Sequence, residues 1–308
     1  MELRKQWTIA MKQNIGGGGI MPPVLDPFDP SVFYVSDGWG SYYSSMRLRK
    51  LSVETGEELD SVLTRDGVRC LHIEEDRLFA VLNKRILEVD RVSLQVIRTY
   101  KKGVPLSMDC VASDGKNQLL MMNRNGCFLN LLDLTAGSVR KKKVETCCGI
   151  LREGADSFLI CTRDGLLRYT TGQNRLIRLA ELEGCVDCAW GDRLYLLCHG
   201  PAGADSARLL EYDPRSGGEP RELLSGVRAR QLALCRDGEH IALLWNNCLT
   251  LYPAAGGTVI FQHSFEKEFV FEDGFRMFDE TAILTYRWSN QLLTRWTLEG
   301  GTLTRKND

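Results

Sequence analysis

The stretch CVDC, with Cys185 and Cys188 at its ends, has the spacing of one half of a zinc site, and Cys198 and His199 follow it. Structural zinc ions are held by such cysteine and histidine ligands. On an extended strand, however, residues three positions apart point to opposite faces, and so do neighbours such as Cys198 and His199. These side chains are therefore expected to diverge and to pack, and the sequence predicts no bound metal and no cofactor.

The four histidines show no pattern typical of acid–base or nucleophilic catalysis. His72, His199, His240 and His263 are spread along the chain, and none stands beside a serine or cysteine motif of known mechanism. His72 lies in the strand-like stretch CLHI and is expected to be a structural histidine. Catalysis by a histidine is therefore not favoured.

Five charged residues interrupt apolar runs that are expected to be strands. Charged side chains in such positions either pair with one another or bind a polar ligand. In a ring-shaped fold these side chains would line the central channel, where pairing with one another is expected over the binding of a small polar ligand. They are Arg69, Asp109, Asp187, Arg230 and Arg276.

Seven short apolar runs recur along the chain at a regular interval. The first and last begin 250 residues apart over six intervals, about 42 residues per unit, which is typical of a four-stranded propeller blade. Each run is followed by a polar turn and a second strand that ends in a turn containing glycine or another turn-forming residue, and glycine supplies the positive φ that a tight reversal requires. The runs are VFYV at 32, LFAV at 78, LLMM at 119, FLIC at 158, LYLL at 194, IALL at 241 and AILT at 282.

These units predict an all-β fold, a single seven-bladed β-propeller of four-stranded antiparallel blades over residues 1–308. No helix-length stretch with the period of an amphipathic helix competes with it, and radially arranged sheets bury their faces on one another. A terminal strand at 6–13 is expected to close the ring, with the tail GTLTRK at 301–306 as the alternative. The blades are expected at roughly 18–65, 66–102, 103–144, 145–183, 184–225, 226–265 and 266–308.

The glycine- and proline-rich stretch NIGGGGIMPPVLDPFDP, residues 14–30, is expected to be the irregular entry into the first blade. A phosphate-binding loop would need a lysine and a serine or threonine at fixed spacing from its glycines, and none follows here. Proline suits an edge or irregular strand because it cannot donate a hydrogen bond to a neighbouring strand.

The repeat pattern resembles the WD-repeat-like superfamily of propellers. Its turns DLTAG, VETG and YTTG are similar to those of YVTN and PQQ-type repeats, and the likeness extends over nearly the whole chain. The resemblance implies a binding platform in which the loops between the second and third strands of each blade open on one face around the central channel. We call this face the loop face.

Aromatic and basic residues are concentrated in the segments that the resemblance places on the loop face. Aromatic and arginine side chains supply most of the strong anchors in protein interfaces. The alternative is that the tryptophans pack as ordinary blade residues. The candidate partner- or ligand-binding residues are Trp39, Tyr42, Tyr43, Arg124, Arg163, His199, Trp245, Arg287 and Trp288.

The composition argues against a polyanion as the ligand. The formal net charge is -1, so attraction to nucleic acid or to anionic lipid would require a local patch. The strongest basic run, VRKKKVE at 139–145, is expected on an outermost strand, where lysine discourages edge-to-edge association. A role of this run in nucleic-acid binding is the alternative, and we expect neither nucleic acid nor a membrane as a partner.

The eleven cysteines are an odd number and lie mostly in apolar runs, where a thiol acts as a small hydrophobic residue. This usage favours a reducing cytoplasm over a disulfide framework. The start MELRKQWTIAMKQ lacks the apolar segment of a secretory signal, and no apolar run is long enough to span a membrane. A cytoplasmic location is therefore expected.

Two functions from different classes fit these features. The first is a non-enzymatic scaffold, monomeric on its own, that binds a protein or peptide partner on the loop face. The second is an enzyme of the lactonase or lyase type, as some propellers that this chain resembles are, with a polar pocket at the channel mouth. Its candidate residues would be Asp109, Asp187, His199, Arg69 and Arg276. The uneven chemistry of the loops favours the scaffold over the enzyme.

Overall fold

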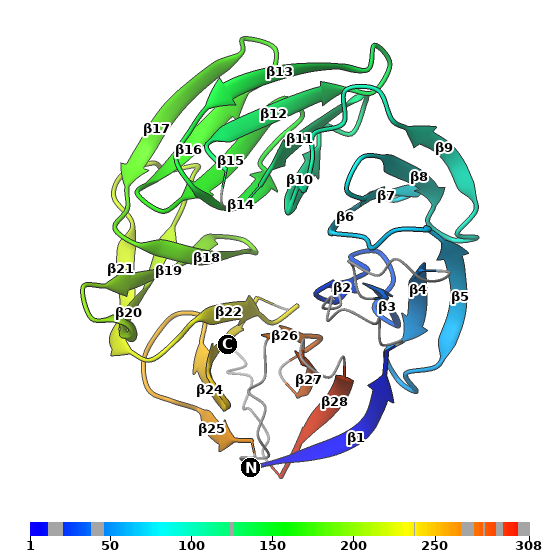
Figure 1. The fold of residues 1–308 in the computed structure, drawn as a ribbon. Coiled ribbons are helices and arrows are strands. Elements are labelled where there is room, and N and C mark those ends of the chain that lie inside the picture. Colours follow the sequence, from blue (N-terminus) through cyan, green and yellow to red (C-terminus); the bar gives the residue numbers. More distant parts are fainter. Residues whose placement is uncertain are drawn as a thin grey trace.

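Every helix or strand that the structure describes is a β-strand. The computed structural model describes residues 1–11, 21–37, 46–123, 126–236, 238–265, 274–279, 281–287 and 292–300, and in them twenty-eight strands form seven four-stranded sheets. The sheets are arranged as blades around a common axis (Figure 1). The predicted seven-bladed all-β propeller is therefore confirmed. Within these ranges, no helix is present that could cross a membrane.

Each blade has its first strand nearest the axis and later strands farther out, and neighbouring strands are antiparallel (Figure 1). In chain order, blades 1 to 4 are β2 (Val24–Leu25), β3 (Val32–Ser36), β4 (Arg47–Ser52) and β5 (Glu58–Leu63); β6 (Cys70–Ile73), β7 (Arg77–Val81), β8 (Ile86–Asp90) and β9 (Val96–Tyr100); β10 (Cys110–Ser113), β11 (Gln118–Met122), β12 (Phe128–Asp133) and β13 (Ser138–Lys143); β14 (Cys147–Arg152), β15 (Ser157–Thr162), β16 (Gly165–Thr170) and β17 (Arg175–Glu181). Blades 5 to 7 are β18 (Cys185–Trp190), β19 (Leu194–Gly200), β20 (Gly203–Tyr212) and β21 (Arg221–Val227); β22 (Gln231–Leu234), β23 (His240–Trp245), β24 (Cys248–Pro253) and β25 (Phe261–Ser264); β26 (Gly274–Met277), β27 (Ala282–Arg287), β28 (Leu292–Glu299) and β1 (Glu2–Ala10).

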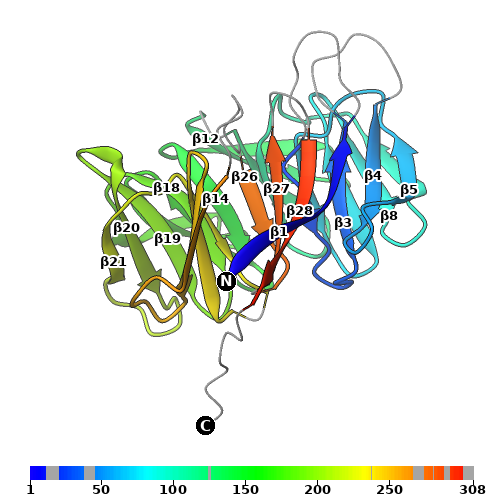
Figure 2. The same ribbon diagram turned by 90° about the horizontal axis from the view of Figure 1, so that it is seen from below.

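The amino-terminal strand closes the ring. β1 is antiparallel to β28, with Glu2 opposite Glu299 and Ala10 opposite Leu292, and Figure 2 shows the two strands side by side. Closure by a terminal strand is therefore confirmed, although the strand runs from 2 to 10 rather than from 6 to 13, and it is the fourth strand of blade 7. Residues 12–20, with the four consecutive glycines, and the tail 301–308 lie outside the described residues.

Trp7 ties the closing strand to blade 1. Its indole ring stacks on the Phe33 ring, with centroids 6.2 Å apart and planes 8° apart. Its Nε1 donates a hydrogen bond to the backbone oxygen of Glu54 at 3.1 Å, and the Glu54 carboxylate accepts one from Arg295 of β28 at 2.8 Å. The first and last blades are thus joined by packing and by polar contacts.

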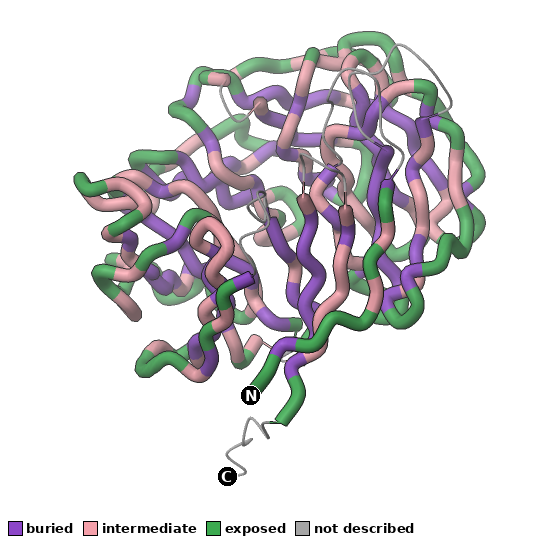
Figure 3. The backbone as a smooth tube through the Cα atoms, turned by 60° about the horizontal axis from the view of Figure 1, so that its bottom comes forward, coloured by how far each residue is buried: buried purple, intermediate pink, exposed green. Residues whose placement is uncertain are grey.

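The apolar core lies between the blades. Each pair of neighbouring blades, including blades 7 and 1, encloses one cluster of buried apolar side chains. The second strands lie deepest, and all five residues of β3 are buried. In Figure 3 the exposed residues gather in the turns and at the outer edge of the ring. Because neighbouring blades cover both faces of a second strand, that strand is a continuous apolar run rather than an alternating one.

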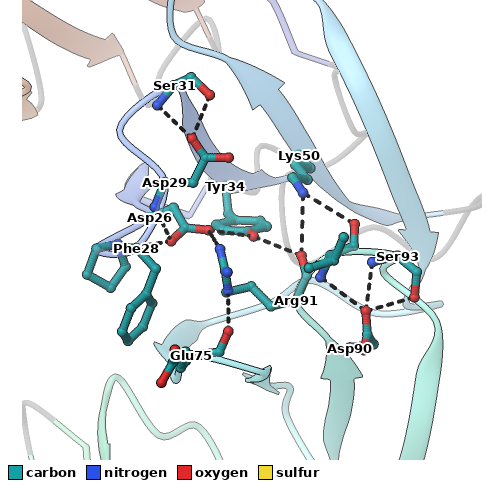
Figure 4. Close-up of polar contacts among 12 residues, drawn as sticks. Asp26, Phe28, Asp29, Ser31, Tyr34, Lys50, Glu75, Asp90, Arg91 and Ser93 are labelled. Atoms are coloured by element: carbon teal, nitrogen blue, oxygen red, sulfur yellow. Dashed lines mark hydrogen bonds and ion pairs between the residues drawn. The ribbon is translucent and has the colours of Figure 1, made fainter.

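A buried carboxylate joins blades 1 and 2 (Figure 4). The fully buried Asp26 accepts hydrogen bonds from the Tyr34 hydroxyl at 3.0 Å and from Arg91 Nη1 at 2.9 Å. Its other oxygen accepts the backbone N–H groups of Phe28 at 2.8 Å and Asp29 at 3.1 Å. Burial, together with the nearby Asp26 charge, raises the pKa of Tyr34 far above its ordinary value, so the hydroxyl stays protonated and donates. A buried charge with this many donors is satisfied within the protein.

Candidate functional site

Four of the nine candidate residues of the loop face lie within the described residues. Arg163 directly follows β15, and His199, Trp245 and Arg287 lie at the ends of β19, β23 and β27. All four therefore stand where the second strand of a blade turns into the third. The other candidates lie outside the described residues and remain predictions: Trp39, Tyr42, Tyr43, Arg124 and Trp288.

Arg163 and His199 come together in one cavity between blades 4 and 5. The cavity has a volume of about 640 Å³ and is lined by residues 146–148, 163–164, 183–186, 199–201 and 203. The backbone of Arg163 is fixed on both sides, because its N–H donates to Thr146 O at 2.9 Å and its carbonyl accepts from Cys185 N at 2.9 Å. The side chain of Arg163 is exposed, and among the described residues no carboxylate forms an ion pair with it.

Hydrogen bonds fix the imidazole of His199 at the cavity. Its Nε2 lies 2.9 Å from the backbone oxygen of Ala229, and because a carbonyl only accepts, Nε2 carries the hydrogen and donates. The backbone N–H of His199 donates to Gly184 O at 2.9 Å. Gly184 has a φ of +69°, and a Cβ there would lie 2.4 Å from the His199 oxygen. Glycine is therefore required for the close approach of the two strands.

A group of thiols forms the floor of the cavity. Cys148 Sγ lies 3.5 Å from Cys185 Sγ, and both residues line the cavity. Hydrogen bonding with Cys148 and with Cys198, together with burial, raises the pKa of the Cys185 thiol well above its usual range. Cys185 is therefore a neutral thiol at neutral pH. None of the eleven cysteines, all of which lie in the described part of the chain, forms a disulfide. In the same part, no three Cys, His, Asp or Glu side chains are grouped so that they could hold a metal ion.

The expectation that Cys185 and Cys188 diverge is wrong, and a register shift in β18 is the reason. Cys185 pairs with Cys198 whereas Cys188 pairs with Leu196, because β18 contains one extra residue between Cys185 and Asp187. The two partners are two positions apart on β19 and share a face, so Cys185 and Cys188 share a face too, and both interact with the Cys148 thiol. The expected divergence of Cys198 from His199 is correct, since Cys198 is fully buried and His199 lines the cavity.

The carboxylates of Asp164 and Glu183 and the thiol of Cys148 also belong to residues that line the cavity, and none of the three was predicted from the sequence. The cysteines were expected to act as small hydrophobic residues, which describes the buried Cys147 but not the half-buried Cys148. Register shifts in β14 and β18 turn these residues. The only sequence signal for Cys148 is its position next to the first residue of an innermost strand, since β14 begins at Cys147 as β18 begins at Cys185.

Trp245, the last residue of β23 in blade 6, stacks against the side chain of Arg230. The guanidinium of Arg230 lies 4.9 Å from the centroid of the Trp245 ring, a distance typical of a cation–π contact. Arg230 is exposed and directly precedes β22. It was expected to line the channel, but it is not among the residues that line the channel cavity.

The charged residues of the inner strands are engaged with the protein itself. Asp109, Asp187 and Arg276 line a channel cavity of about 410 Å³. Asp109 accepts a hydrogen bond from Arg69 Nη2 at 2.5 Å, and Asp187 accepts the backbone N–H of Leu232 at 3.0 Å. Arg276 Nη1 donates to the backbone oxygen of Phe275 at 2.8 Å. These contacts satisfy much of the polar surface of the channel without a ligand.

Comparison with known proteins supports the fold. No protein-family model matches the sequence, and no curated protein is similar to it at a significant level. Among solved structures, the WD40 domain of Pan2 from Neurospora crassa superposes with a TM-score of 0.70, at 7% sequence identity, over 97% of this chain and 96% of that one. At this identity the likeness shows the propeller fold, and the site must be argued from its own residues.

Proposed function

We propose that this protein is a non-enzymatic scaffold that binds a protein or peptide partner on its loop face, with the cavity between blades 4 and 5 as the main contact. The observation that carries the proposal is the exposed guanidinium of Arg163 at a concave site that also contains His199. Arginine is enriched among the residues that contribute most to protein binding. A partner carboxylate would find in Arg163 a planar donor with no competing ion pair among the described residues.

A second anchor lies close to the cavity in the chain. Ala229, whose carbonyl accepts the hydrogen bond from His199, directly precedes Arg230, and Arg230 stacks on Trp245. Stacking holds the guanidinium and the indole in one arrangement, so little conformational entropy is lost when a partner contacts them. The cavity and the stacked pair together support a partner surface that extends from blade 4 to blade 6.

The channel supports the enzyme alternative less well. A general base needs a carboxylate or imidazole within reach of the substrate proton. Asp109 and Asp187, the carboxylates of the channel, already accept hydrogen bonds from Arg69 Nη2 and from the Leu232 N–H. His199 lines the cavity between blades 4 and 5 rather than the channel cavity. The proposal therefore places function in recognition rather than turnover, and it includes a chain that is monomeric on its own, acts in the cytoplasm and binds neither nucleic acid nor a membrane.

The test is quantitative affinity purification from cells that make the protein. We expect a co-purifying protein whose yield falls by about tenfold or more with Arg163→Glu, and also with Trp245→Ala. Lys5→Glu is the matched control, because Lys5 is an exposed basic residue on the outer strand of blade 7, and it should leave the yield unchanged. Equal yields from all four proteins, at unchanged melting temperatures, would remove the proposal.

A further inference from the structure

A second concave site lies between blades 2 and 3, away from the cavity that contains Arg163. Its volume is about 610 Å³, and it is bounded by the segment 103–108, which leads from blade 2 to blade 3, and by β12 and β13. We call it the blade 2–3 groove. Its walls are mainly apolar and include Val104, Pro105, Leu106, Met108, Phe128 and Val139.

Two large apolar side chains of the groove are exposed to solvent. Leu106 is 58% exposed and Phe128 is 47% exposed. A single exposed apolar residue is ordinary on a protein surface, but apolar side chains that gather at a concave site mark an interaction surface. The groove therefore offers an apolar anchor point that the fold itself does not cover.

Lysines border this apolar surface. Val139 and Lys141 line the groove, and Lys143 shares their face because alternate residues of β13 point the same way. In the strand register Lys141 lies opposite Asn130 and Lys143 lies opposite Phe128. No carboxylate lines the groove, and within the described ranges neither lysine forms an ion pair. The positive charge of this edge is therefore not neutralised by the protein.

Asn130 adds a hydrogen-bond acceptor. It is only 4% exposed, and its Nδ2 donates to the backbone oxygen of Phe128 at 3.1 Å, which fixes the orientation of the amide. Its Oδ1 accepts no hydrogen bond from the described residues. Because Asn130 lines the groove, this oxygen is placed to accept a backbone N–H from a bound peptide.

We propose that the blade 2–3 groove binds an acidic peptide segment of a partner protein that carries an aromatic or aliphatic anchor. The anchor would pack on Leu106 and Phe128, and flanking carboxylates would pair with Lys141 and Lys143. The apolar walls favour a peptide over a nucleic acid, which requires a basic groove with several stacking aromatics. This site uses none of the residues of the proposed loop-face contact, so either proposal stands if the other fails.

The experiment measures binding of a fluorescein-labelled peptide, DEDFEELD, to the full chain by fluorescence anisotropy. We expect saturable binding that weakens by about tenfold or more with Lys141→Glu/Lys143→Glu, and by a similar factor with Phe128→Ser. Lys5→Glu should bind as the unchanged protein does. Phe128 and the two lysines are exposed, so melting temperatures should stay close to the unchanged value.

Three outcomes would overturn the proposal. The peptide DEDSEESD keeps the charge but lacks the apolar anchors. If it binds as tightly as DEDFEELD, the site recognises charge alone. An oligothymidylate that binds the same lysines at least as tightly would assign the edge to nucleic acid. Absence of peptide binding, or binding that both the lysine variant and Phe128→Ser retain, would show that the groove is not the site.

Discussion

His72 lies on β6, the innermost strand of blade 2, and its Nε2 is 3.8 Å from the carboxylate of Glu74. Burial lowers the pKa of His72 below its ordinary value; Glu74 opposes this effect, and the charges of Arg152 and Arg77 add to it. The lowered pKa means that the folded protein favours the neutral ring. This agrees with the structural role expected for His72.

The pKa of His72 makes stability depend on pH in a defined direction. Above the pKa that His72 has in the unfolded chain, its ring is neutral in both the folded and the unfolded state, and the free energy of unfolding does not depend on this group. As the pH falls below that value, the unfolded chain binds a proton before the folded protein does. The free energy of unfolding therefore decreases until the pH passes the lower pKa of the folded protein. Replacing His72 by Gln should therefore flatten the fall in melting temperature below neutral pH, relative to the unchanged protein. Thermal scans across this range check it, and parallel curves for the two proteins would contradict it.

The positions of single charged residues were only partly predictable from the sequence. The resemblance to known propellers predicts that Arg163 and His199 lie on one face, and the structure brings them to one cavity. Arg230 stands in the strand-like stretch VRARQLAL, yet β22 begins only at Gln231. Asp109 also directly precedes its strand, β10, yet it lines the channel cavity, whereas Arg230 lies over Trp245. The direction of a side chain just before a strand depends on the local backbone, which a single sequence does not define so finely.

At the scale of elements, the sequence predicts the buried second strands of the blades but not the register shifts in the first strands. Runs such as FLIC become β15 because both faces of the strand are covered, which requires apolar residues at successive positions. The extra residue in β18 leaves no such mark, because Cys185, Val186 and Asp187 suit a regular strand equally well. The packing of β14 against β18 therefore depends on a feature that only the strand pairing reveals.

Gly149 of β14 lies close to Cys188 of β18. A Cβ at this position would lie 2.4 Å from Cys188 Sγ, so Gly149→Ala should destabilise the protein by about 1–3 kcal/mol through overpacking. Removing the sulfur with Cys188→Ala should make room, and the double variant should be less destabilised than the sum of the two single changes by at least about 0.5 kcal/mol. Urea unfolding followed by tryptophan fluorescence measures all three; simple additivity would show that the two atoms do not compete.

At the scale of the whole molecule, the apolar core is divided into seven clusters, one at each junction between neighbouring blades. Six junctions join blades that are consecutive in the chain. The seventh joins blade 7 to blade 1, and the amino-terminal segment takes part in it. Trp7 of β1 and Met11, just beyond β1, pack into the cluster between blades 7 and 1. Leu3 of β1 packs into the cluster between blades 6 and 7. Removing residues 1–11 would therefore weaken two junctions and expose the edge of β28.

A circular permutant tests whether strand pairing rather than chain order closes the ring. Glu2 lies opposite Glu299 in the antiparallel pair, so joining Asp308 to Met1 and opening the chain between Gly16 and Gly17 would place the four strands of blade 7 in consecutive order. The permutant keeps every described strand and strand pair, so we expect a melting temperature within about 5 °C of the unchanged protein. A chain that lacks residues 1–11 should melt well below both. If the truncated chain is as stable as the permutant, β1 contributes nothing to closure; if the permutant fails to fold, the pairing of β1 with β28 does not describe the closed ring.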